Sequence, residues 1–227
     1  MKHRRIFALL AALLLLGALA GCKKDEGSPI SPLSDIPLTM ESVQKQIDSM
    51  KVEDFEETDE TTDFVKISVK DHGDIVVRLR LDAAPITVQN FQTLVGQGFY
   101  DGLTFHRVYP GFMIQGGDPE GTGSGGSGTN IKGEFASNGV QNPLKHVRGV
   151  ISMARATKPD TASSQFFIMH ADNGDLDGNY AAFGYVVAGL STVDSVCTVE
   201  LGYNAWGEPT APLSPVVITS ATFVTPR

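Results

Sequence analysis

The chain has 227 residues, of which 41% are hydrophobic and 19% charged, and its formal net charge is −8. This length suffices for one well-packed domain, and the acidic balance excludes the clustered basic surface that a nucleic-acid-binding protein needs. Two cysteines are too few for a disulfide framework or a cysteine-based zinc site. The 24 glycines and 12 prolines predict a turn-rich chain, closer to a β protein than to a helical bundle.

The first 21 residues have the pattern of a secretory signal peptide. A basic start is followed by an apolar run at residues 6–20, which at 15 residues is shorter than a membrane-spanning helix needs. The run ends in Leu19-Ala20-Gly21-Cys22, which resembles a bacterial lipobox. In that interpretation Cys22 is lipidated and becomes the mature N-terminus. The alternative is an ordinary signal peptide with an incidental cysteine, which explains only the small residues at the cleavage site.

The protein is therefore expected to be an extracytoplasmic lipoprotein, attached to a bacterial membrane through Cys22. Cleavage before this residue removes Lys2, Arg4 and Arg5 and no acidic residue, so the formal net charge changes from −8 to −11. The mature chain is then distinctly acidic.

Residues 22–63 are predicted to form a tether that holds the domain away from the bilayer. Three prolines interrupt any regular helix in its first part. Residues 53–63 carry seven acidic residues and no basic one, which is typical of a solvated, self-repelling spacer. Between these parts, the i, i+4, i+7 spacing of Val43, Ile47 and Met50 predicts a short amphipathic helix.

Residues 64–227 are predicted to form the folded domain. Val65, Ile67 and Val69 alternate with polar residues, and a turn sequence follows at residues 71–73. The alternation then resumes, which predicts a β-hairpin with one buried face.

Two helices are predicted in this domain. Pro85 suits the first turn of one helix, whose apolar stripe includes Phe91 and which ends near Gly96. The other helix is predicted to begin at Ser191, because residues 191–194 resemble a capping box.

Further apolar runs, separated by glycine-containing loops, predict short strands at residues 112–115, 149–154, 165–169, 181–187 and 216–224. Many short strands with two helices favour a β-barrel or a β-sandwich, and a closed barrel would leave no exposed edge. The residue pattern alone does not choose between the two.

The common catalytic and cofactor motifs are absent or lack their structural context. Residues 121–126 fit G-x-G-x-x-G, but no helical pattern follows them, so a flexible loop is predicted rather than a dinucleotide site. No serine lies in a nucleophile elbow, and His106, His146 and His170 lack the spacing of metal ligands. Cys197 is predicted to be a small buried hydrophobe in the second helix. We therefore expect neither a metal nor a cofactor.

The segment FHRVYPGFMIQGGD at residues 105–118 stands out by its composition. It combines one arginine with aromatic residues, methionine and glutamine, directly before the glycine-rich loop. Such a segment suits a shallow apolar pocket with one fixed cation. It also suits an ordinary strand pair with Arg107 in a surface ion pair, and spacing alone leaves both interpretations open.

This segment resembles the signature of the cyclophilin-type peptidyl-prolyl isomerases, and the likeness extends over about residues 64–224. Further matching blocks follow in the same order: GEF at 133–135, GVISMA at 149–154, SQFFI at 164–168, LDG at 176–178 and FG at 183–184. The short connections resemble the compact bacterial members. The resemblance implies a mainly β fold, a closed eight-stranded antiparallel barrel capped by two α-helices. It also implies cis/trans isomerisation of X-Pro bonds, without a nucleophile, metal or cofactor.

The resemblance also implies roles for individual residues. The catalytic set is Arg107, Phe112 and Gln115, in which the arginine donates to the prolyl nitrogen and the glutamine holds the carbonyl that swings. The implied substrate-binding residues are His106, Met113, Ala154, Arg155, Gln165, Phe167, Leu176 and Tyr180. For Phe167, a core role and a pocket role are both expected.

Three positions depart from the family pattern. Asp175 stands where many eukaryotic members carry a tryptophan, and Trp206 lies too far along the chain to replace it, so weak cyclosporin binding is expected. Tyr180 replaces a common histidine, and Arg155 replaces a frequent asparagine.

The leading hypothesis is thus a monomeric, lipid-anchored isomerase that acts on proline-containing peptides and unfolded exported proteins. A non-catalytic peptide-binding or chaperone module is the main alternative, and a surface adhesin that uses the barrel as a scaffold is a third. The presence of Arg107, Phe112 and Gln115 favours catalysis.

Overall fold

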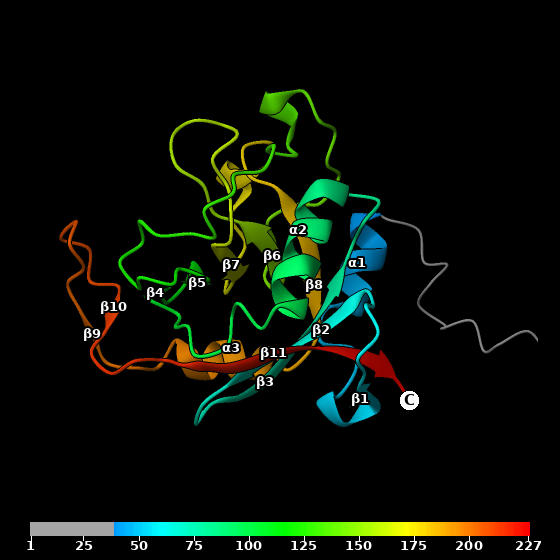
Figure 1. Ribbon diagram of the computed structural model, residues 1–227, viewed down its shortest axis with the longest axis horizontal. Coiled ribbons are helices and arrows are strands. Elements are labelled where there is room, and N and C mark those ends of the chain that lie inside the picture. The colour runs from blue at the N-terminus through cyan, green and yellow to red at the C-terminus, as the bar shows by residue number, and fades with distance from the viewer. Residues whose placement is uncertain (1–38) are drawn as a thin grey trace, which may run out of the picture. The chain divides into compact units, whose positions relative to one another are not determined.

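The computed structural model describes residues 39–227, which are built on one nine-stranded antiparallel sheet (Figure 1). In spatial order its strands are β1 (Phe55–Glu57), β11 (Ile218–Pro226), β2 (Phe64–Val69), β3 (Gly73–Leu79), β8 (Ala182–Ala188), β6 (Val150–Met153), β7 (Phe166–Met169), β5 (Met113–Gly116) and β4 (Arg107–Tyr109). A separate two-stranded ribbon is made by β9 (Leu201–Gly202) and β10 (Ala211–Pro212). Cys22 and the predicted signal peptide lie outside the described residues.

Three α-helices occur in residues 39–227: α1 (Met40–Gln46), α2 (Pro85–Gly96) and α3 (Leu190–Val196). Short 3₁₀ turns are η1 (Val52–Asp54), η2 (Ala136–Asn138) and η3 (Gly174–Leu176). None of the helices in this part of the chain has the length and apolarity that crossing a membrane requires. The predicted mainly β class is correct, and α2 and α3 are the two helices predicted for residues 64–227.

The predicted closed eight-stranded barrel is not confirmed, because the sheet has nine strands and two ends, β1 and β4. Near these ends, the segment before β4 meets the start of β11. The Gly102 N–H donates to the Ile218 carbonyl, and the Phe105 N–H donates to the Val216 carbonyl. Gly102 has a φ of 81°, so the chain turns here and forms only an isolated bridge, Thr104 to Val217, instead of a continuous ladder.

The predicted hairpin is confirmed as β2 and β3. The turn between them holds Asp71 at a φ of 63° and Gly73 at 115°, conformations that favour aspartate and glycine. The helix predicted to start at Pro85 is confirmed as α2. The predicted capping box at Ser191 is wrong: α3 begins one residue earlier, and its N-cap is Gly189, whose φ of 82° places it in the left-handed region.

Residues 40–63 differ from the tether that was predicted over residues 22–63. The amphipathic helix is present as α1, and its Val43 is fully buried. After it, the Asp48 and Met50 N–H groups donate to carbonyls of β8. The segment therefore packs on the domain, because it carries apolar side chains at the spacing of a helix face.

The first part of the acidic run forms η1 and the edge strand β1 rather than a spacer. Phe55 is buried, whereas Glu56 and Glu57 of β1 face solvent as the strand pairs with β11. Glu57 forms an ion pair with Lys66 of β2. Exposed charges on an edge strand discourage pairing with another chain, so the acidic residues suit this position.

The core lies between α2 and the sheet and is dominated by aromatic rings. Phe91 of α2 packs against Tyr100, Phe166 and Phe183 at centroid distances of 5.0, 5.5 and 5.1 Å. All four side chains are at most 1% exposed. Such tilted and edge-to-face contacts add to the free energy gained by burial, so this cluster anchors the helix to the sheet.

We predict that Val43→Ala lowers the free energy of unfolding by about 2 kcal/mol, because a buried side chain loses contacts and leaves a cavity. Lys45→Ala, on the exposed face of the same helix, serves as the control and should change stability by less than about 0.5 kcal/mol. Urea unfolding measures both. Equal stabilities of Val43→Ala and the wild type would show that α1 does not contribute to the fold.

Candidate active site

One row of side chains crosses four neighbouring strands. Arg107 of β4 lies opposite Gln115 of β5, Gln115 lies opposite Phe167 of β7, and Phe167 lies opposite Ser152 of β6. Residues directly opposite each other in an antiparallel pair share a face of the sheet. Residues that are remote in the sequence are thereby brought to one face.

The neighbouring row points the other way. Val108, Ile114, Ile168 and Ile151 are register partners, one residue along from the first row, and all four are fully buried in the core. Because side chains alternate between faces along a strand, the same four strands build the core and the floor of a pocket.

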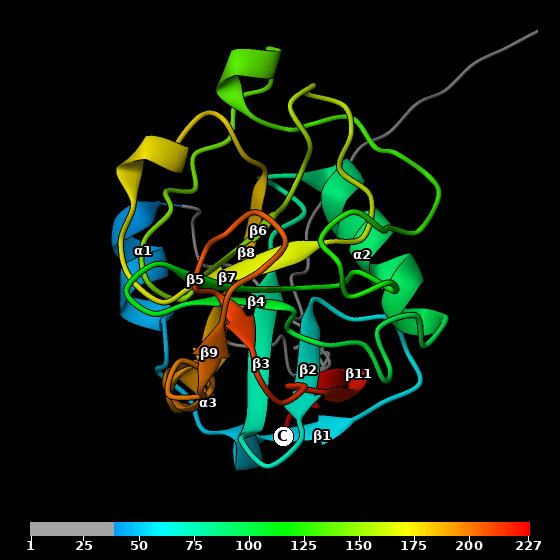
Figure 2. The ribbon, with the colours of Figure 1, turned by 90° about the vertical axis from the view of Figure 1, so that its left-hand side faces the viewer.

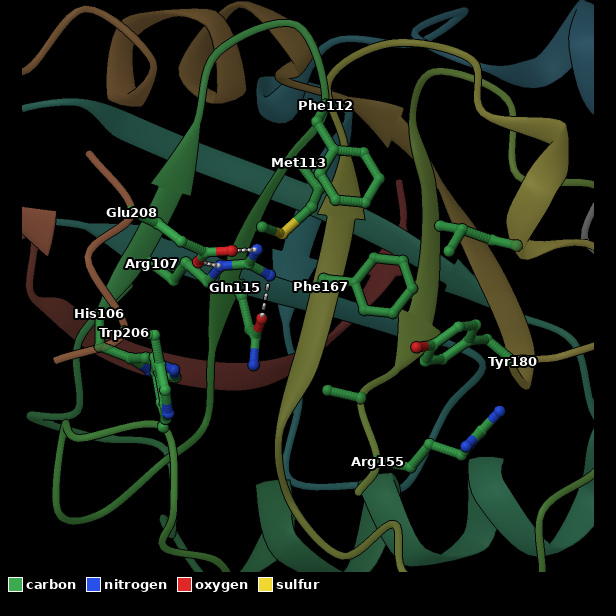
Figure 3. Close-up of a pocket in the computed structure, with 13 residues that line it drawn as sticks. His106, Arg107, Phe112, Met113, Gln115, Arg155, Phe167, Tyr180, Trp206 and Glu208 are labelled. Atoms are coloured by element: carbon green, nitrogen blue, oxygen red, sulfur yellow. Dashed lines mark hydrogen bonds and ion pairs between the residues drawn. The ribbon is translucent and has the colours of Figure 1, made fainter. Parts of the chain in front are cut away.

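The pocket above this face has a volume of about 430 Å³ (Figure 3). Its lining residues are His106, Arg107, Phe112, Met113, Gln115, Gly123, Ala154, Arg155, Phe167, Leu176, Tyr180, Trp206 and Glu208. Every residue of the domain that the sequence assigned to the site, except Gln165, is among them. Gly123, Trp206 and Glu208 were not predicted.

A second hollow of about 580 Å³ adjoins the first and contains Gln165. Both are lined by Gln115, Gly123, Ala154 and Arg155. The two hollows therefore form one continuous groove.

The glycine-rich loop at residues 121–126 is ordered by one carboxylate. Asp118 accepts hydrogen bonds from the backbone N–H groups of Glu120, Thr122, Gly123 and Gly125. Burial of this carboxylate opposes its ionisation, but the backbone donors outweigh burial and lower its pKa. The segment is a loop, as predicted, yet its shape is set by Asp118 rather than left flexible.

A chain of polar contacts runs along the pocket floor. Arg107 Nη1 donates to Gln115 Oε1 at 3.4 Å, and Gln115 Nε2 donates to Gln165 Oε1 at 2.8 Å. Gln165 Nε2 then donates to the carbonyls of Gly123 and Gly125. Each amide is thus oriented by its neighbour, and one N–H of Gln115 is left without a partner among the described residues.

The far wall of the pocket is apolar. Met113 and Phe167 are 2% and 5% exposed, and Phe112 and Leu176 are half-buried above them. The Phe112 ring meets Tyr109 edge-on, with centroids 5.8 Å apart. Phe167 is both packed and pocket-lining, in agreement with the two roles expected of it.

Behind Phe167 lies a buried Ser-His-Asp chain. His146 Nδ1 is 3.0 Å from Asp177 Oδ1, and His146 Nε2 is 3.0 Å from Ser152 Oγ. Since a carboxylate only accepts, Nδ1 carries the proton and Nε2 accepts from the serine. Ser152 is fully buried, so no substrate can reach its hydroxyl. The His146 ring stacks on Phe167 at 6.0 Å, so this chain supports the pocket wall and is not a hydrolytic triad.

His106 and Trp206 form the opposite rim. Both ring nitrogens of His106 are buried and have no hydrogen-bond partner among the described residues. Burial is the main cause that lowers the pKa of His106, and the imidazole is therefore neutral near pH 7. Trp206 is 61% exposed and lies against Gly123 beside His106.

Trp206 was expected not to replace a tryptophan at residue 175, and it lies instead on the rim beside His106. The loop between β9 and β10 carries it to the pocket, although Asp175 itself is exposed in η3 and does not line the pocket. No sequence pattern links Trp206 or Glu208 to residue 107. The only signal was the single tryptophan of the chain in a loop of turn-forming residues.

Arg155 and Tyr180 close the other end. The Arg155 guanidinium lies 4.7 Å from the Tyr180 ring centroid, and its Nε donates to the Asn179 carbonyl. The arginine side chain is therefore held by cation–π and backbone contacts.

Other candidate chemistry does not reach the pocket. Within residues 39–227, no three His, Cys, Asp or Glu side chains lie close enough together to bind a metal ion. Cys197 is half-buried at the end of α3, and burial raises the pKa of its thiol to about 11. A protonated thiol is a poor nucleophile, which agrees with the structural role predicted for it.

Comparison with known proteins agrees with this site. A family model described as cyclophilin type peptidyl-prolyl cis-trans isomerase/CLD matches residues 64–223. The chain is 51% identical over 122 residues to peptidyl-prolyl cis-trans isomerase B of Bacillus subtilis, which covers 54% of this chain and 82% of that protein. It is 40% identical over 161 residues to peptidyl-prolyl cis-trans isomerase A of Dickeya dadantii, which covers 67% of this chain and 80% of that protein.

A solved structure is also similar. It is a cyclophilin type peptidyl-prolyl cis-trans isomerase of Cryptosporidium parvum in the presence of the dipeptide Ala-Pro, with a TM-score of 0.62 and 32% identity. The match covers 70% of this chain and 98% of that one. The fold and the pocket thus define a proline-isomerising enzyme. The chain belongs to the cyclophilin-type peptidyl-prolyl cis-trans isomerases.

We predict that the stability of the domain falls as the pH drops below about 6.5. Burial is the main cause that lowers the pKa of His146, so the unfolded chain takes up a proton that the folded chain resists. The loss is at most about 1.4 kcal/mol per pH unit for this group. The pKa of Asp177 is lowered as well, so its stabilisation is present at neutral pH and is lost only in a more acidic range.

Urea unfolding between pH 7 and pH 5 measures this slope. His146→Gln should flatten it, and His106→Gln should remove a separate share, because burial lowers the pKa of His106 too. An unchanged slope in His146→Gln would contradict the assignment of a neutral, buried His146.

Proposed function

We propose that Arg107 catalyses the rotation of X-Pro bonds by donating a hydrogen bond to the prolyl nitrogen. The observation that carries this proposal is the position of its guanidinium. The side chain is 24% exposed and lines the pocket beside its apolar wall, between Glu208 and Gln115 (Figure 3). Of its five N–H donors, two meet Glu208 and one meets Gln115. Two donors are left for a substrate.

The chemistry needs no covalent step. The barrier to rotation about a peptide bond is about 18–20 kcal/mol, because the nitrogen lone pair is delocalised into the carbonyl. In the twisted transition state that lone pair is localised and accepts a hydrogen bond. A donor at the nitrogen therefore binds the transition state better than the planar ground states. An acceleration on the order of 10⁵ requires about 7 kcal/mol of such preference.

The other groups hold the substrate while one part of it turns. The wall made by Phe112, Met113, Phe167 and Leu176 suits the apolar proline ring. The unused N–H of Gln115 suits the carbonyl before the proline. Since the polar chain from Gln165 orients Gln115 in advance, this donor needs no rearrangement when substrate binds.

We expect Arg107→Ala to lower kcat/KM by at least about 100-fold, the usual loss when one donor to a developing charge is removed. Arg107→Lys should stay slow, because an ammonium group does not reproduce the planar fork. Arg148→Ala, which removes an arginine paired with Asp194 away from the pocket, is the matched control. A protease-coupled proline-peptide assay measures all three.

The same assay separates catalysis from simple binding. If the wild type is no faster than Arg107→Ala although both bind the peptide, the pocket serves a non-catalytic peptide-binding or chaperone module. An inactive wild type that binds no proline peptide would favour the scaffold hypothesis.

We also propose that the enzyme is an extracytoplasmic lipoprotein of a bacterial membrane, anchored through Cys22, that assists the folding of exported proteins as a monomer. The support is the sequence of the first 22 residues: a basic start, a short apolar run, and a cysteine directly after small residues. Unfolded exported chains offer the X-Pro bonds whose slow rotation limits folding.

Mass spectrometry of the mature protein tests this anchor. We expect an N-terminus at Cys22 that carries a lipid, and we expect Cys22→Ser to leave the protein unlipidated and outside the membrane fraction. An unmodified Cys22 in the mature wild type would rule the anchor out, and it would leave the isomerase activity of the domain untouched.

A further inference from the structure

The arginine of the pocket is held by a carboxylate that lies 101 residues further along the chain. Arg107 Nε is 3.0 Å from Glu208 Oε2, and Arg107 Nη2 is 3.2 Å from Glu208 Oε1. This is a bidentate pair, in which one edge of the guanidinium is matched to both carboxylate oxygens. Figure 3 shows the guanidinium between Glu208 on one side and Phe167 on the other.

The loop that carries Glu208 is built around Asn204. Asn204 Oδ1 accepts from the N–H groups of Trp206 and Glu208, and Asn204 Nδ2 donates to Glu208 Oε2 at 2.9 Å. The backbone N–H of Asn204 donates to the Glu208 carbonyl as well. The carboxylate is therefore fixed by its own loop before it meets Arg107. The side-chain amide of Asn204 is the main cause that lowers the pKa of Glu208, and Arg107 acts in the same direction.

The loop is in turn attached to the pocket at two places. At its end, the Val108 N–H of β4 donates to the Thr210 carbonyl, so the loop is joined to the strand that carries Arg107 (Figure 2). At its tip, Trp206 lies against Gly123, where an added Cβ would come within 2.5 Å of the indole ring. These two contacts hold Glu208 in register with Arg107.

We propose that Glu208 is a positioning residue that holds the Arg107 guanidinium in the orientation needed for isomerisation. A long arginine side chain at the rim of an open pocket has many rotamers, and only some of them direct donors at the proline site. Glu208 occupies the edge formed by Nε and Nη2. Nη1 then donates to Gln115, and one N–H on Nη1 and one on Nη2 have no partner among the described residues. The inference rests on the proposed role of Arg107.

The ion pair between Arg107 and Glu208 stabilises the transition state more than it strengthens peptide binding. A misplaced donor still leaves the apolar wall and the groove intact, so a peptide binds as before. The misplaced donor, however, does not meet the prolyl nitrogen of this peptide when the X-Pro bond is twisted. Loss of Glu208 should therefore lower kcat and leave KM nearly unchanged.

The test measures kcat and KM with a proline peptide for Glu208→Ala, Glu208→Gln and Asn204→Ala. We expect Glu208→Ala to lower kcat between about 10- and 100-fold, the scale of a small misplacement of a reacting group. Glu208→Gln should lose as much, because an amide accepts with one atom only and turns its NH₂ towards the guanidinium. Asn204→Ala keeps the carboxylate but frees it, so a smaller loss is expected.

Glu200→Ala is the matched control, because Glu200 precedes β9 at the base of the same ribbon and does not line the pocket. It should behave as wild type. The Arg107 Nε–H resonance in a ¹⁵N spectrum provides a readout that loop stability alone does not move. It should shift and exchange faster with solvent in Glu208→Ala, while the other amide signals keep their positions.

A double mutant separates this inference from the role of Arg107. If Glu208 acts through Arg107, the Arg107→Ala/Glu208→Ala double mutant is no slower than Arg107→Ala alone. Wild-type or higher kcat in Glu208→Ala, with Arg107→Ala still slow, overturns the positioning role and leaves the arginine mechanism in place. Wild-type kcat in Arg107→Ala overturns the arginine mechanism itself.

Discussion

The register of β4, β5, β7 and β6 is the constraint on which the rest of the structure depends. It places Arg107, Gln115 and Phe167 side by side on one face, and it sends Val108, Ile114 and Ile168 into the core on the other. A slip of one residue in any of these pairings would exchange the two faces. It would bury the guanidinium and expose the isoleucines. The free energy gained by the core therefore also fixes the position of the site, and fold and function are stabilised by the same ladder of hydrogen bonds.

Several polar groups around this face are joined in chains of hydrogen bonds, which hold the pocket in one shape before substrate arrives. One chain runs from Glu208 through Arg107, Gln115 and Gln165 to the loop that Asp118 organises. Another runs behind Phe167 through Ser152, His146 and Asp177. Partly satisfied buried networks are costly, whereas fully connected ones favour a single arrangement. An enzyme that lowers a rotational barrier by placing one donor benefits from such rigidity, because the donor must not move with the bond it acts on.

Residues 40–63, which precede the part that matches the family, fold differently from what their acidic composition predicts. Their acidic residues predict a solvated spacer, and Glu56 and Glu57 are indeed exposed. Yet Phe55 and Val43 are buried, and β1 adds a strand to the edge of the sheet beside β11. Repulsion between exposed charges is weak in water, and burial of two apolar side chains with backbone pairing outweighs it. The acidic residues then protect the sheet edge from another chain.

The sequence by itself determined the local elements and most of the pocket. Alternation located β2 and β3, the helical stripe located α2, and the block from residue 105 to 118 identified the family and so Arg107, Phe112 and Gln115. These signals are local, because side-chain period and turn chemistry act over a few residues. Tertiary structure alone decided that the sheet keeps two ends, that residues 40–57 pack on it, and that Trp206 and Glu208 reach the pocket. Such contacts join residues about a hundred or more positions apart. Their free energy depends on the final distance between side chains, which no local pattern in the chain records.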